Sequence, residues 1–117
     1  MIKILLFVKR KDGISRDQFV DYYENNHVPL IRSHVGQFIE SYTRNYIDPD
    51  APLSASTGSA RLDVDVVTEL VVRDVDTMQR MFAVAAEPTV AADIAADEEK
   101  FVDRSASRMF VADVYPR

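Results

Sequence analysis

The chain has 117 residues, the size of a single domain, and its hydrophobic share of 47% is enough to build a core. It has no cysteine, which excludes disulfides, thiolate metal sites and cysteine nucleophiles, and its formal charge of −5 disfavours broad binding to nucleic acid. No apolar run is long enough to span a bilayer, and the first residues lack the organisation of a signal peptide. We therefore expect one cytoplasmic domain, not bound to membranes, that acts on a small molecule or on a partner.

The elements that the pattern predicts follow one another as strand, helix, strand, loop, strand, two helices and strand. This order matches the split βαβ arrangement of a ferredoxin-like α+β fold, in which helices cover one face of a four-stranded antiparallel sheet. The loop at Asp48 to Ser59 is rich in turn formers, and it either covers a site or is a plain surface excursion. The predicted strands are Ile2 to Lys9, Phe38 to Ile47, Leu62 to Arg73 and Ser107 to Tyr115, and the predicted helices are Ser15 to about His27, one capped by Asp76 and ended by Pro88, and Val90 to Asp103.

A capping-box pattern at Ser15 and Gln18 predicts where the first helix begins. Pro29 disfavours helical backbone in the residue before it, so we expect this helix to end at about His27. His27 then lies one turn beyond Tyr23 on the same side, where the carbonyl end of the helix stabilises a protonated imidazole. Proton exchange near neutral pH is one interpretation of His27, and a helix cap or a packed residue is the structural alternative.

A longer pattern surrounds this histidine and reads Phe19-x-x-Tyr22-Tyr23-x-x-x-His27-x-Pro29-Leu30. Together with Val67-Thr68-Glu69-Leu70 and Asp97-Glu98-x-x-Phe101-x-Asp103, it resembles the EthD family of the dimeric α+β barrel group. The resemblance implies a homodimer of ferredoxin-like subunits. The residues also favour a dimer, because both faces of the first strand are apolar and the face away from the helices needs a second sheet or a ligand to cover it.

Alternation on the third strand separates a uniformly apolar row, which we assign to the helix side, from a row that contains Glu69. Glu69 then faces the space between two subunits, where burial would raise its proton affinity and suit it to acid–base work. The structural alternative is a salt bridge from Glu69 to Arg44 or Lys3. On the second strand, we expect Tyr42, Arg44 and Tyr46 to line the same cavity.

Several other polar residues allow two interpretations. Asp97 is either a ligand group of the site or part of a solvated helix face. The basic cluster from Lys9 to Lys11 either attracts an acidic substrate or simply ends a strand, and His34 is expected to be exposed.

The resemblance implies cofactor-independent proton transfer by a lyase, isomerase or cyclase on an aromatic, polyketide or lactone-like substrate. Within that reaction, we expect His27 to be the acid–base, Tyr23 to orient it or donate a hydrogen bond, and Glu69 to be a second acid–base or an orienting carboxylate. The expected substrate-binding residues are Tyr42, Tyr46, Arg44, Phe7 and Asp97.

No phosphate loop, nucleophile elbow, dinucleotide fingerprint or pair of histidines at metal-ligand spacing occurs in the sequence, so we expect neither a cofactor nor a metal. Haem binding occurs elsewhere in the superfamily, and His27 could serve as an axial ligand, but nothing else in the sequence supports it. Two alternatives stay open. One is a non-catalytic dimer that binds a small molecule or supports a pathway partner, and the weaker one is a cofactor-independent monooxygenase.

Overall fold

The computed structural model describes residues 1–52 and 63–116. Its four strands form one antiparallel sheet in the order β2-β3-β1-β4, which is the split βαβ arrangement, so the predicted ferredoxin-like α+β class is confirmed. In the described part, no helix has the length and apolar character needed to cross a membrane. The strands are β1 (Ile2–Val8), β2 (Ile39–Tyr46), β3 (Val66–Val72) and β4 (Arg108–Ala112); the helices are α1 (Arg16–Tyr22), α2 (Val28–Val35), α3 (Val75–Ala85) and α4 (Pro88–Glu98), with a π-helical turn η1 (Tyr23–His27) and 3₁₀ turns η2 (Gly36–Phe38) and η3 (Arg104–Ala106).

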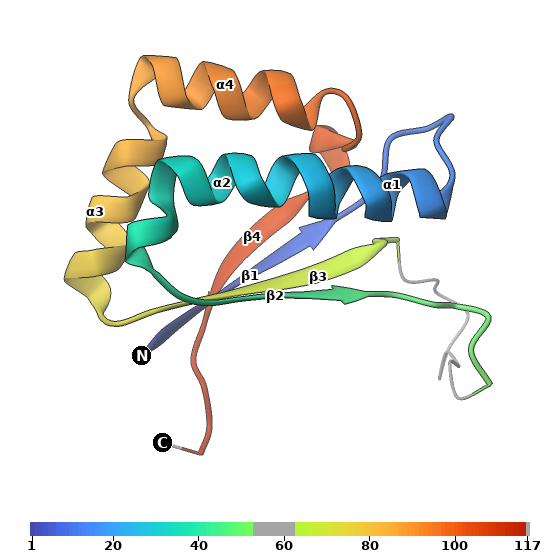
Figure 1. Cartoon of the computed structure of the whole chain (residues 1–117). Helices are drawn as coiled ribbons and strands as arrows, with labels where there is room; N and C mark the ends of the chain where they lie inside the picture. The colour runs from blue at the N-terminus through green and yellow to red at the C-terminus, as the bar shows by residue number, and fades with distance from the viewer. Residues whose placement is uncertain (53–62, 117) are drawn as a thin grey trace.

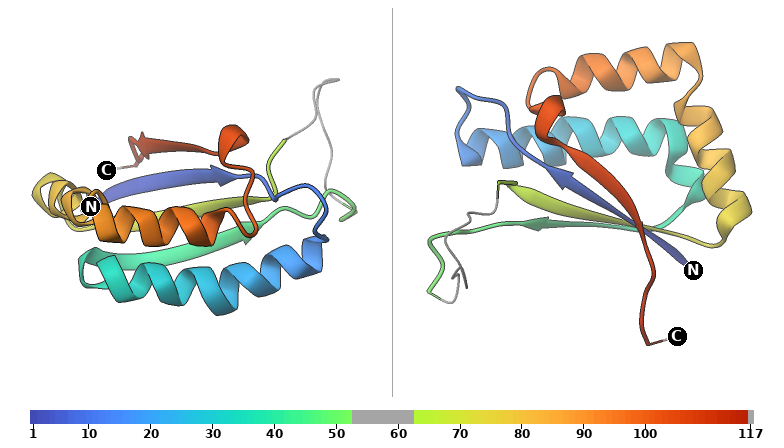
Figure 2. Two further views of the ribbon diagram at one scale, coloured as in Figure 1. Left: turned by 90° about the horizontal axis from the view of Figure 1, so that it is seen from above. Right: turned by 180° about the vertical axis from the view of Figure 1, so that it is seen from behind.

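All four helices lie on the same side of the sheet, as Figures 1 and 2 show. The side chains of one β3 row, from Val66 through Thr68 to Val72, are almost fully buried beneath them. The assignment of this row to the helix side is therefore confirmed. Phe19 from α1 and Phe101 from the segment after α4 are also fully buried, and both belong to the core cluster that contains Val66 of β3.

The first helix does not end at His27 as predicted. The capping box of Ser15 and Gln18 starts it as expected, but the chain then passes through η1 and continues as α2. Pro29 falls in the first turn of α2, where its missing N–H needs no partner. In the wider turn before it, the N–H of Val28 donates to the carbonyl of Tyr23, five residues back. The proline is therefore accommodated by a change of helical pitch.

Other predicted boundaries also shift. Asp74, rather than Asp76, caps α3, because its carboxylate accepts hydrogen bonds from the backbone and hydroxyl of Thr77. Pro88 ends one helix as predicted, but it also begins α4, which stops at Glu98 rather than at Asp103. Of the predicted loop from Asp48 to Ser59, the part from residue 53 onward lies outside the described residues.

The face of the sheet opposite the helices has no covering layer within the described chain (Figure 1). It carries apolar side chains all the same. Phe110 of β4 is 53% exposed there, and its ring meets the ring of Phe7 edge to face at 5.8 Å. Leu5 shares this face, because it pairs directly with Phe110 across the two strands.

Candidate active site

His27 contacts the carboxylate of Asp97, which comes from the last turn of α4. The distance from His27 Nδ1 to Asp97 Oδ2 is 2.8 Å, and Tyr22 donates its hydroxyl to the other oxygen, Asp97 Oδ1, at 2.7 Å. One carboxylate thus binds two side chains from the first helical segment, which consists of α1 and η1. Asp97 is not part of a solvated helix face, because its side chain is only 11% exposed and that of His27 only 12%.

Aromatic rings enclose this group. The imidazole of His27 lies 5.1 Å from the ring of Tyr23, nearly at right angles, and 5.0 Å from the ring of Phe101. Tyr22 also packs on Phe101, at 4.9 Å between centroids. Such apolar walls strengthen the electrostatic interaction between imidazole and carboxylate, because they exclude water from around it. Burial also raises the pKa of the Glu98 carboxyl, which adjoins Asp97.

The chemistry of the two partners fixes the direction of their hydrogen bond. An ionised carboxylate has no proton to donate, so the imidazole of His27 must donate through Nδ1. In the neutral imidazole, Nε2 then keeps its lone pair and can accept a proton. Asp97 also stabilises the positive charge that develops when it does. The group therefore has the parts of an oriented general base.

The π-helical turn η1 explains why Tyr22 and His27 can reach the same carboxylate. Residues five apart in a regular α-helix of 3.6 residues per turn point roughly 140° away from each other. Within η1 the hydrogen bonds span five residues, so the two side chains lie closer to one face. The same turn sends Glu24 toward β2, where it meets Arg44.

The tyrosines of β2 are on the helix side, not in the cavity where they were predicted. Tyr42 pairs with Leu70 and Tyr46 with Val66, and both partners belong to the buried row of β3. The prediction chose the wrong face because phenol and guanidinium groups are also typical of a cavity lining. Here Arg44 and Tyr46 bind the Glu24 carboxylate of the helical segment. Burial raises the pKa of both phenols well above its ordinary value, so they remain protonated.

Hydrogen bonds from both β2 and β3 join the sheet to the helical segment of α1 and η1. Tyr23 shares a hydrogen bond of 2.6 Å with the hydroxyl of Thr68, which is the polar member of the buried β3 row. Arg44 forms a two-pronged bond to the Glu24 carboxylate at 2.9 and 2.6 Å, and Tyr46 donates to the same carboxylate at 2.5 Å. Tyr23 therefore does not hydrogen-bond His27, and its contact with the imidazole is through the ring alone.

Glu69 lies on the opposite face of the sheet from His27, so the structure does not bring the predicted acid–base pair together. Its carboxylate bonds to the Asn45 amide at 3.0 Å and to Lys3 Nζ at 3.0 Å. These bonds lower the pKa of Glu69, whereas burial had been predicted to raise it. The prediction failed because the side chain is still 29% exposed and its neighbours are donors. The alternative, a salt bridge to Lys3, is what forms.

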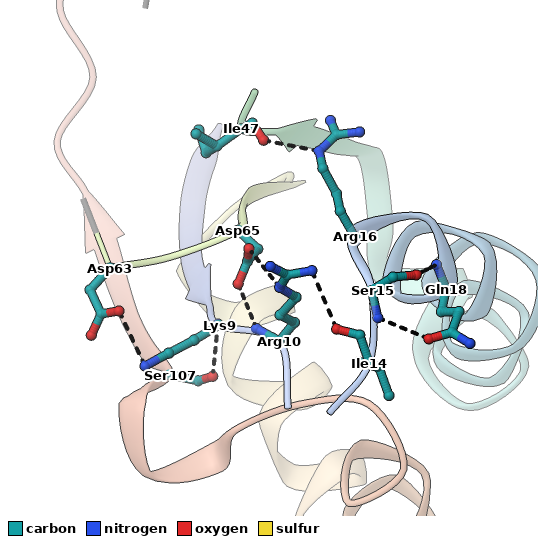
Figure 3. Close-up of polar contacts among 10 residues, drawn as sticks. All are labelled: Lys9, Arg10, Ile14, Ser15, Arg16, Gln18, Ile47, Asp63, Asp65 and Ser107. Carbon is teal, nitrogen blue, oxygen red and sulfur yellow. Dashed lines mark hydrogen bonds and ion pairs between the residues drawn. The ribbon is translucent and has the colours of Figure 1, made fainter. Parts of the chain in front are cut away.

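The basic cluster at the end of β1 borders a cavity of about 290 Å³ that lies apart from His27 and Asp97. Figure 3 shows its polar contacts: Lys9 pairs with Asp63 at 3.2 Å, and Asp65 accepts from the backbone N–H of Arg10 at 2.8 Å. Acidic partners thus offset the cations of the cavity wall. His34 is less exposed than predicted, because it bonds to Asp93 of α4 at 2.9 Å.

The sequence patterns predicted no functional role for three residues of this network, namely Tyr22, Glu24 and Thr68. Thr68 carried a usable signal, since a hydroxyl in a buried row needs a partner. Tyr22 and Glu24 carried none, because only the change of pitch at η1 decides which of them faces α4. In residues 1–52 and 63–116, no group of three or more histidine or acidic side chains could hold a metal ion.

Comparison with known proteins identifies a family for this chain. The model of the EthD domain matches residues 11–105, which include His27 and Asp97. An EthD-like protein from Ralstonia eutropha JMP134 has a similar structure, with a TM-score of 0.67 and 18% identity over 99% of this chain and 94% of that one. No curated protein matches the sequence.

Two further solved structures share the fold at lower identity. SnoaB from Streptomyces nogalater, a cofactor-independent oxygenase, has a TM-score of 0.61 and 11% identity over 99% of this chain and 94% of that one. A dimeric protein of unknown function with a ferredoxin-like fold, from Bacteroides fragilis, has a TM-score of 0.55 and 8% identity over 97% and 95%. At these identities the likeness concerns the fold alone. Because the family model covers most of its length, the chain belongs to the EthD family.

Proposed function

We propose that this protein catalyses cofactor-independent acid–base chemistry, of the lyase, isomerase or cyclase type, on an aromatic, polyketide or lactone-like small molecule. The supporting observation is the hydrogen bond of 2.8 Å between His27 and Asp97 inside an aromatic enclosure. An imidazole held in this way is a base whose second nitrogen is free to take a proton from carbon or oxygen. Its pairing with a carboxylate from another element is the usual arrangement for orienting a catalytic histidine.

In this mechanism His27 Nε2 removes a proton from the substrate, and the Asp97 carboxylate stabilises the resulting imidazolium. The proton then returns to another atom of the substrate or to the leaving group, which completes an isomerisation, a cyclisation or an elimination. Tyr23 forms a wall against the imidazole, and the network of Arg44 and Tyr46 holds the adjoining turn through Glu24. We assign no step to Glu69, because it lies across the sheet.

We also propose that two copies associate through the uncovered sheet face. Phe7 and Phe110 place aromatic surface there, which a second sheet would remove from water. The dimeric Bacteroides fragilis protein of the same fold supports this arrangement. A dimer of this kind leaves the His27 group of each copy on its own helix side.

The test uses proton exchange, because it does not depend on knowing the product. The purified protein is incubated in D₂O with unsaturated lactones, acidic phenols and β-keto aromatic acids, and loss of substrate C–H signals is followed by NMR. We expect His27→Ala to lose roughly 100-fold or more of the exchange rate on a compound that the wild type accepts. The matched control is His34→Ala, which removes the other histidine and leaves the rate unchanged. Equal rates in wild type and His27→Ala would end the proposal.

The second candidate is a non-catalytic binding protein. It is favoured by the fact that, among the described residues, every fully buried side-chain nitrogen and oxygen has a hydrogen-bond partner, so the His27 group also makes sense as a structural cluster. Ligands that raise the melting temperature without undergoing exchange would support this candidate. Oxygen uptake with an anthrone or hydroquinone would instead point to a monooxygenase.

A further inference from the structure

Tyr22 contacts the acid–base group without belonging to it. Its hydroxyl donates to Asp97 Oδ1, while His27 uses Asp97 Oδ2, so each oxygen of the carboxylate has one donor. A carboxylate held by a single donor can turn about its last side-chain bond. Two donors on different oxygens fix that rotation. Here both come from the same helical segment, since Tyr22 directly precedes η1 and His27 is its last residue.

The Tyr22 hydroxyl is suited to act as a permanent donor. Burial, with the Asp97 carboxylate as a second cause, raises its pKa to about 12, so it keeps its proton throughout the neutral range. Its ring is held independently, because it packs on Phe101 at 4.9 Å. The donor thus stays in place whatever the charge of His27.

We infer that Tyr22 is a positioning residue, which locks the Asp97 carboxylate so that His27 keeps its proton on Nδ1 and presents Nε2 as the basic nitrogen. The use of Nε2 in a reaction rests on the proposed function, whereas the locking is a property of the three side chains. The π-helical turn is the backbone device that makes it possible. In a regular α-helical turn, Tyr22 and His27 would point roughly 140° apart and away from a common carboxylate.

The experiment observes the imidazole directly and needs no substrate. Histidine-selective ¹⁵N labelling and two-bond ¹H–¹⁵N spectra report which ring nitrogen carries the proton, and solvent-exchange measurements report how long the Nδ1 proton stays. We compare the wild type with Tyr22→Phe, which keeps the ring on Phe101 and removes only the hydroxyl. His34 is an internal control in the same spectra, because its partner Asp93 is independent of Tyr22.

In the wild type we expect one tautomer for His27, with the proton on Nδ1. In Tyr22→Phe we expect a mixture of tautomers and exchange of the Nδ1 proton that is faster by on the order of tenfold, with the His34 signals unmoved. Unchanged His27 signals in a folded Tyr22→Phe protein would overturn the inference. If that variant does not fold, the wild type still decides, because the inference requires a slowly exchanging Tyr22 hydroxyl proton and a rapidly exchanging one contradicts it.

The outcomes also separate this inference from the proposed function. If His27→Ala keeps full exchange activity while Tyr22→Phe shifts the His27 tautomer, the function fails and the positioning stands. If His27→Ala is inactive while Tyr22→Phe leaves the tautomer unchanged, the proposed function stands and the positioning role of Tyr22 fails.

Discussion

His27 and Asp97 are separated by 70 positions in the chain, yet Nδ1 and Oδ2 lie 2.8 Å apart with both side chains almost buried. The contact joins the turn after α1 to the last turn of α4, so it exists only when the two helical segments pack side by side. A hydrogen bond to a charged group in such surroundings contributes more than one at the surface, and it also determines which imidazole nitrogen is available.

The first prediction concerns Asp97→Asn. The amide keeps the shape of the carboxylate but not its charge, so it no longer stabilises the imidazolium of His27. We expect the proton-exchange rate to fall by roughly 100-fold while the protein stays folded. The measurement is the D₂O exchange assay with circular dichroism on the same samples, and Asp93→Asn, which alters the partner of His34, is the control. A wild-type rate in folded Asp97→Asn would show that the carboxylate does not assist.

A second prediction concerns the buried bond between Tyr23 and Thr68. Tyr23→Phe leaves the Thr68 hydroxyl without this partner inside the core, so we expect the free energy of unfolding to fall by about 1–3 kcal/mol. Thr68→Val should have a similar effect. The double variant should lose clearly less than the sum, because removing both partners leaves no unpaired group. Denaturant unfolding of the four proteins measures this cycle, and strict additivity would contradict the coupling.

The third prediction concerns pH and the Glu24 carboxylate. Hydrogen bonds from Arg44 and then Tyr46 hold its pKa below the ordinary 4.5, so the group stabilises the fold above that pH and loses this contribution as the pH falls through the lowered value. We expect Glu24→Gln to cost roughly 1 kcal/mol at pH 7 and progressively less below about pH 4. Unfolding at several pH values tests this, with the exposed Glu40→Gln as the control. A cost independent of pH would mean that charge plays no part.

The fourth prediction concerns the uncovered sheet face. Phe110→Asp places a charge at the proposed interface, and we expect it to convert a dimer into a monomer at micromolar concentration. Sedimentation or light scattering after gel filtration gives the mass directly. Val75→Asp alters a similarly exposed apolar residue on α3 and should leave the dimer intact. A monomeric wild type would refute the proposed association.

The strands and their order along the chain could be predicted from the sequence, and one row of β3 shows why. The burial of every second residue, Val66, Thr68, Leu70 and Val72, follows from the two-residue period of a strand, and that period can be read directly from the sequence. On β2 the same period was found, but the side was misassigned. A tyrosine row is compatible with either face, and only the partners of Tyr42 and Tyr46 across the sheet decide which one it occupies.

The helical segment around His27 shows a second limit. Pro29 signalled a break, because its local backbone restriction is strong. In the structure Val28 nevertheless keeps helical backbone angles, and the turn before Pro29 widens to hydrogen bonds that span five residues. Local rules could predict an irregularity near His27, but not that the change of pitch would let Tyr22 and His27 bind the same carboxylate.

The sequence by itself determined the fold class, the family resemblance and the importance of the segment around His27, because these depend on period, capping and short-range spacing. Only the tertiary structure decided that Asp97 is the partner of His27, that Glu69 lies across the sheet, and that Tyr22 binds the same carboxylate as His27. The reason is physical. Each of these outcomes depends on how two distant elements pack, and packing is set by the whole core rather than by any stretch of neighbouring residues.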